Sequence, residues 1–115
     1  MSITRFRGHA AGRNRCVEYG GIVHAVATST AAGIAEQTRQ TLAHLDESLA
    51  MAGSDRTRIL RAQIFLADMS QKAEMDAVWN EWIGPDWQTW PQRACVGAPL
   101  AGNNLVEIVL TAAKR

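Results

Sequence analysis

Three side chains near the C-terminal end stand out because their sequence neighbours are mostly apolar. Glu107 interrupts the apolar run at residues 105–110, and Arg93 and Cys95 share the segment at residues 90–96. A carboxylate within a strand can activate a water molecule or carry a proton. Arginine has a planar fork of N–H donors that suits a carboxylate ligand. These residues are therefore the candidates for binding a small carboxylic acid and activating water.

Each candidate also has a structural interpretation. From periodicity alone, the structural interpretation of Glu107 has a probability of about one half. In it, Glu107 lies on an edge or interface strand and faces water or an arginine. A lone arginine such as Arg93 is more often a surface residue or part of a structural salt bridge. A free cysteine is more often a small buried hydrophobe than a nucleophile. No histidine adjoins Cys95 in the sequence, so no thiolate mechanism is proposed.

The hydrophobic pattern predicts the elements that position these residues. Gly53 ends the first predicted helix, and Asp68 with Gln71 predicts a capping box for the second. The alternation in the middle strand places Leu60 on its buried face. Predicted strands cover residues 3–7, 15–18, 22–27, 57–66, 93–98 and 105–112, and predicted helices cover residues 33–52 and 70–83.

This order predicts an α+β fold, with two helices on one face of a mixed sheet of about six strands. The other face of the sheet would leave an apolar patch too large for a monomer, so a partner subunit is expected there. The length of 115 residues predicts one domain, residues 1–115.

Composition narrows the function classes. The formal net charge is +1 and no basic block occurs, which argues against nucleic-acid binding. Two cysteines without a Cys/His cluster indicate neither a disulfide framework nor a zinc site. Residues 1–15 lack the apolar stretch of a signal peptide, and no apolar run is long enough to cross a membrane. We therefore expect a cytoplasmic protein with no membrane partner and no metal site.

A register argument limits where Arg93 and Glu107 can meet. If the last two strands formed a simple hairpin around residues 101–104, the two residues would lie five positions apart, roughly 17 Å along the ladder. One small ligand could hardly touch both. Either these strands are not direct neighbours, or the site is shared across subunits.

The chain resembles the Rid family, the reactive intermediate deaminases, which is also called the YjgF family. The resemblance covers residues 30–113 well and the first 30 residues weakly. Its most specific part is a Pro-x-Arg-x-Cys segment followed by Val-Glu-Ile. The matching residues are Pro91, Arg93, Cys95, Leu100 and the stretches 105–108 and 111–113.

The resemblance implies a chorismate-mutase-like fold and a homotrimer with pockets between subunits. Active members hydrolyse reactive 2-imino acids to 2-keto acids and ammonia, and they need no metal or cofactor. Carried over to this sequence, Arg93 would bind the substrate carboxylate and Glu107 would position the attacking water. The main-chain carbonyl of Cys95 would help to hold that water.

The sequence departs from the family pattern at two places. Arg13 stands where many active members carry an aromatic residue, and Val26-Ala27 replaces a frequent Ser-Gly pair. Both changes alter the expected pocket wall, and Arg13 would favour a more acidic ligand than 2-iminopropanoate. Two alternatives to the deaminase stay open. One is a non-catalytic trimer that binds a small carboxylate, and the other is a regulatory trimer that acts through its surface.

Overall fold

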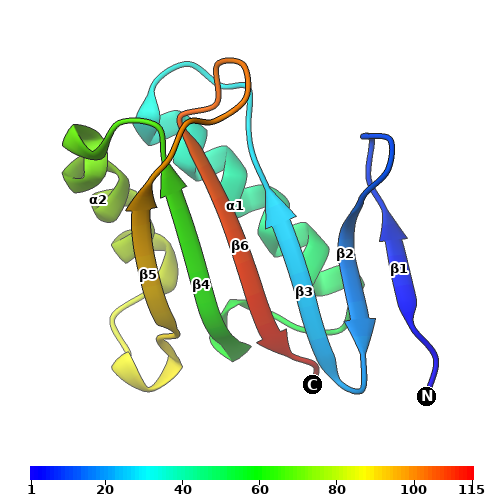
Figure 1. The fold of residues 1–115 in the computed structure, drawn as a ribbon. Coiled ribbons are helices and arrows are strands. Elements are labelled where there is room, and N and C mark those ends of the chain that lie inside the picture. The colour runs from blue at the N-terminus through cyan, green and yellow to red at the C-terminus, as the bar shows by residue number, and fades with distance from the viewer.

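The computed structural model describes all residues from 1 to 115 and contains one six-stranded sheet with two α-helices (Figure 1). Every strand and helix expected from the sequence is present, including the short N-terminal strand. The elements are β1 (Thr4–Arg7), β2 (Asn14–Tyr19), β3 (Ile22–Ala27), α1 (Ile34–Met51), β4 (Ile59–Leu66), α2 (Lys72–Ile83), β5 (Gln92–Gly97) and β6 (Val106–Ala113).

The strands are arranged in the order β1-β2-β3-β6-β4-β5. Only β4 and β5 are parallel, and α2 supplies the crossover that parallel neighbours require. Both helices cover the same face of the sheet, as Figure 1 shows. The predicted α+β fold is therefore confirmed. Neither helix is long and apolar enough to cross a membrane.

The last two strands are not neighbours. Strand β4 lies between β5 and β6, and it pairs with both. The Gly102 turn predicted between them exists, with φ of 57° and a hydrogen bond from Asn104 N to Ala101 O, but it lies in a connection that crosses the end of β4. The first alternative considered for these strands is therefore correct: they are not direct neighbours, and no hairpin joins Arg93 to Glu107.

The core lies between the sheet and the helices. The apolar side chains of α1 that recur at steps of three and four residues form one buried stripe, in which Leu45 and Leu49 are 0% exposed. Gly53 follows the helix with φ of 80°, a left-handed conformation that glycine adopts without steric cost. There the Ser54 N–H donates to the Leu49 carbonyl at 2.8 Å, which satisfies one of the carbonyls left free at the helix end.

Two local expectations are wrong. Leu60 is 51% exposed because a bulge skips it, so that Ile59 pairs with Ala112 and Arg61 with Thr111. Ile59 takes the buried position instead. The capping box also does not form. Asp68 accepts a hydrogen bond from Ser70 N at 2.9 Å and starts a short 3-10 turn, while the side-chain oxygen of Gln71 is buried without a partner.

Candidate functional site

Arg93 lies on edge strand β5 and points toward the helices. It pairs with Ala62, which is fully buried, so the two side chains share the helix-covered face. The Arg93 Nη2 atom donates to Asp76 Oδ1 at 2.7 Å, and the guanidinium carbon lies 5.5 Å from the centre of the Trp79 ring. Both contacts come from α2. Arg93 thus makes a salt bridge of the kind that its structural interpretation predicts. This salt bridge occupies only one nitrogen of the guanidinium.

Asp76 is shared between two cations. Its Oδ2 atom accepts from Lys72 Nζ at 2.6 Å, one helical turn earlier, while Oδ1 accepts from Arg93. Partial burial by itself would raise the pKa of Asp76. The hydrogen bonds and charges of Lys72 and Arg93 outweigh this effect, so the pKa lies below its ordinary value. Asp76 is therefore a carboxylate at neutral pH.

Cys95 shares the face of Arg93, as the two-residue period predicts. Burial raises the pKa of the Cys95 thiol, and the charge of Arg93 only partly opposes that effect. A protonated thiol is a poor nucleophile, so the structure offers no support for a thiolate mechanism at Cys95. Because β5 has a neighbour on one side only, half of its backbone groups point away from the sheet. These groups can bind water or ligand.

Glu107 lies on the opposite face of the sheet, which we call the open face because no helix covers it. Its neighbours Val106 and Ile108 are fully buried under the helices, whereas Glu107 is half-buried beside Phe65. Glu107 makes no hydrogen bond or salt bridge within the chain. A half-buried carboxylate without a partner is available for water, ligand or a group from another subunit.

Buried Gln37 on α1 anchors the connection that leads to Glu107. Its side-chain nitrogen donates to the Asn103 carbonyl at 3.1 Å, and its oxygen accepts from Leu105 N at 2.7 Å. Gln37 is only 2% exposed, so its own end of both bonds is shielded from water, whereas the Asn103 end reaches the surface. The predicted helix over residues 33–52 includes Gln37, but its helical pattern does not reveal this contact.

Arg93 and Glu107 cannot touch one small ligand within a single subunit. They are on opposite faces, and the β-ladder places Arg93 level with Leu110, three positions along β6 from Glu107. Two strand spacings and three residues separate their Cα atoms by roughly 14 Å. A small ligand that touched both residues would have to lie between two subunits.

Arg13 is also remote from Arg93 in the subunit. It is exposed in the connection between β1 and β2, and strands β3, β6 and β4 separate β2 from β5. Four strand spacings amount to roughly 19 Å. Val26, the first residue of the altered pair, lies on the open face beside Val109, and Ala27 pairs with Ile108 on the helix side.

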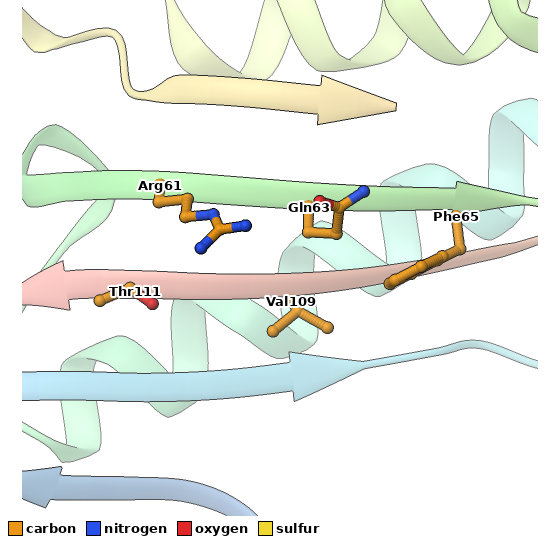
Figure 2. Close-up of a pocket in the computed structure, with 5 residues that line it drawn as sticks. All are labelled: Arg61, Gln63, Phe65, Val109 and Thr111. Carbon is orange, nitrogen blue, oxygen red and sulfur yellow. The ribbon is translucent and has the colours of Figure 1, made fainter. Parts of the chain in front are cut away.

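The open face also carries a shallow hollow that the sequence analysis did not single out. Figure 2 shows Arg61, Gln63 and Phe65 on β4 with Val109 and Thr111 on β6 around it. Arg61 is exposed and has no salt bridge within the chain. The sequence pattern that could have indicated this hollow is the mixed polar and apolar set Arg61, Gln63 and Phe65, which alternates with the buried residues of β4. No group of three or more His, Cys, Asp or Glu residues is placed to hold a metal ion.

Comparisons with known proteins place the chain in a family. The family profile described as "Endoribonuclease L-PSP" matches residues 2–114. A RutC family protein of Haemophilus ducreyi is 44% identical over 79 residues, which are 68% of this chain and 66% of that protein. The match therefore spans just under two thirds of this curated relative.

Solved structures agree over the full length. A member of the YjgF protein family from Neisseria meningitidis has a TM-score of 0.91 and 38% identity, covering 100% of this chain and 97% of that one. A member of the YjgF/YER057c/UK114 family from Mycobacterium tuberculosis has a TM-score of 0.87 and 28% identity, with coverage of 97% and 99%. The chain therefore belongs to the endoribonuclease L-PSP family, whose members include the YjgF, RutC and Rid proteins.

Proposed function

We propose that the chain forms a homotrimer and hydrolyses small 2-imino acids to 2-keto acids and ammonia at sites between subunits. The observation that carries this proposal is the state of Arg93. Its guanidinium is half-buried, is held at one nitrogen by Asp76 and makes no other hydrogen bond in the chain. A guanidinium held in this way can receive a substrate carboxylate through its remaining N–H groups.

The separation of Arg93 from Glu107 favours a shared site. The open face carries half-buried apolar side chains, including Phe65 and Val109, together with exposed Val96. In a cyclic trimer each contact joins two different surfaces and closes after three copies. An arrangement in which the β5 edge of one subunit approaches the open face of the next would cover these apolar residues. It would also bring Arg93 and Glu107 of different subunits toward one pocket.

The reaction needs orientation and one placed water. With the substrate carboxylate on Arg93, the imine carbon faces a water held by Glu107 and the Cys95 carbonyl. The water oxygen bonds to the carbon, the C=N electron pair moves to nitrogen, and Glu107 takes the water proton. Glu107 then returns this proton to the nitrogen, which gives a carbinolamine with one hydroxyl and one amino group. Glu107 next takes the hydroxyl proton and passes it to the amino group, so the C–N bond breaks, ammonia leaves and the carbonyl forms. One imine and one water give one keto acid and one ammonia, and Glu107 ends as it began.

The test follows imine decay directly. An amino-acid oxidase generates the imine from 2-aminobutanoate or alanine in the presence of semicarbazide, which traps what remains. Wild type should accelerate decay, and Arg93→Ala should lower kcat/KM by about 100-fold, the loss expected for a charged hydrogen-bonded contact. Arg39→Ala is the matched control, because Arg39 only pairs with Glu36 on the exposed side of α1. No acceleration by wild type with any of several amino acids would contradict the proposal.

A second candidate is a non-catalytic trimer that binds a small carboxylate. The observation that favours it is that Glu107 has no residue in its own chain to orient it, so catalysis depends wholly on the assembly. In that case 2-oxobutanoate would bind, Arg93→Ala would abolish binding, and no imine would be hydrolysed. RNA cleavage has less support, because 12 basic and 11 acidic residues give a nearly neutral chain.

A further inference from the structure

We propose that Asp76 is a positioning residue, which fixes the Arg93 guanidinium in the orientation that receives the ligand carboxylate. The inference rests on the proposed function of Arg93 and deepens it. It concerns a residue of α2 whose role the sequence pattern does not reveal, because Asp76 and Arg93 are 17 positions apart.

The guanidinium is restrained from two directions. Asp76 holds its edge through a 2.7 Å hydrogen bond, and the Trp79 ring lies 5.5 Å from the guanidinium carbon. Arginine has a long and flexible side chain, but its donors form a rigid plane. Fixing one edge and one face of this plane also fixes where its remaining N–H groups point. Arg93 is therefore preorganised for a planar carboxylate before any ligand arrives.

Asp76 is itself restrained. Lys72 holds Oδ2 at 2.6 Å while Arg93 holds Oδ1, so the carboxylate cannot rotate without losing a contact. The side chains of Asp76 and Arg93 are 25% and 21% exposed, which limits competition from water. Burial of the neighbouring Trp79 fixes the helix beneath them. The helix therefore fixes the Asp76 carboxylate, and this carboxylate fixes the Arg93 guanidinium.

The charges of this cluster also indicate the ligand. Lys72 and Arg93 supply two positive charges and Asp76 supplies one negative charge, so one positive charge remains without a partner. A ligand with one carboxylate at this end would neutralise it. Removing the negative charge while keeping an acceptor oxygen would increase the attraction for anions and preserve the geometry. Such a substitution of Asp76 therefore distinguishes a role in positioning Arg93 from a role that depends only on the negative charge of Asp76.

Three variants of Asp76 test the role. Asp76→Ala removes the acceptor and should raise KM for the imine, and Kd for 2-oxobutanoate, by about 10-fold, because a loosened site loses oriented contacts. Asp76→Asn keeps an acceptor oxygen for Arg93 and should restore KM and Kd to wild type or tighter. Asp76→Glu keeps the charge but moves the carboxylate by one methylene, so it should raise KM with little change in Tm. Glu74→Ala removes an exposed carboxylate on the same helix and is the matched control.

The outcomes separate this proposal from the proposed function. A residue that only fastened α2 to β5 would lower Tm on substitution and leave KM and Kd unchanged. Unchanged KM and Kd in both Asp76→Ala and Asp76→Glu would therefore overturn the inference. If wild type binds 2-oxobutanoate but does not accelerate imine decay, the deaminase proposal fails and the Kd values alone decide the role of Asp76. If wild type neither binds nor hydrolyses, both proposals are wrong.

Discussion

Arg93 and Glu107 extend from opposite faces of one sheet, and strand β4 separates the strands that carry them. Arg93 contacts Asp76 beneath the helices, whereas Glu107 lies on the open face without a partner. Their Cα atoms lie roughly 14 Å apart by strand spacing and register, too far for one small molecule to contact both side chains from opposite faces of the same subunit. Any chemistry that uses both residues on one small molecule must therefore come from an assembly of subunits.

The first prediction concerns substrate charge. Arg13 is exposed and makes no salt bridge within the chain. If it reaches a neighbouring subunit's pocket, it adds a positive charge for a second carboxylate. Wild type should then hydrolyse the imine of aspartate with a higher kcat/KM than the imine of alanine. Arg13→Ala should remove this preference by lowering kcat/KM for the aspartate-derived imine about 10-fold, as expected for a lost charged contact. It should leave kcat/KM for the alanine-derived imine unchanged.

Arg7→Ala is the control for this prediction, because Arg7 is also exposed and lies on β1, six residues before Arg13. The comparison uses the same coupled assay with both imines at matched concentrations. Equal rates of wild type on the two substrates would remove the support for a role of Arg13 in selection.

The second prediction concerns pH and stability. The folded-state pKa of Asp76 lies below the ordinary carboxyl value of about 3.9. Its contribution to the free energy of unfolding is therefore fully present above that pH, and it is lost as pH falls through the folded-state pKa. Wild type should exceed Asp76→Asn in stability at pH 7 by on the order of 1 kcal/mol, as for a partly exposed ion pair.

Urea unfolding at pH 7 and at several values below pH 4 measures this difference. The advantage of wild type should shrink steadily on the acid side. An advantage that stays constant across the series would mean that the charge of Asp76 does not stabilise the fold.

The third prediction concerns the connection that leads to Glu107. Gln37→Met keeps the length of the side chain but leaves the Leu105 N–H and the Asn103 carbonyl without their buried partner. Such a loss costs about 1–3 kcal/mol for each unsatisfied group. We expect a lower free energy of unfolding, measured by urea denaturation. Gln88→Met is the control because Gln88 is exposed and its side chain makes no hydrogen bond, and equal stability of the two variants would refute the role assigned to Gln37.

The sequence predicted the fold well where the pattern is periodic. The stripe on α1 follows the 3.6-residue period over five turns, and β6 alternates between buried and half-buried residues throughout. Both patterns arise because each element buries one face against the other. The bulge at Leu60 was missed because a bulge inserts one residue without altering the composition of the strand. The failed capping box has a similar cause, since an Asp-x-x-Gln pattern also suits a short turn.

The candidate site was predictable only in part. Residue type and the family resemblance identified Arg93 and Glu107 as candidates, and alternation correctly placed Cys95 beside Arg93. Asp76 was not predictable, because its contact with Arg93 depends on how α2 lies across β5. The strand order was equally hidden, since a turn-forming sequence at residues 101–104 fits both a hairpin and a crossover over β4.

Subunit mixing tests the central claim, a catalytic site shared between subunits, most directly. Arg93→Ala and Glu107→Gln are each expected to be nearly inactive. When equal amounts are unfolded together and refolded, half of the subunits can supply Arg93 and half can supply Glu107. About a quarter of the sites then combine both intact residues, so activity should return to about a quarter of wild type. A mixture that remains as inactive as its parents, although mixed trimers form, would contradict the account.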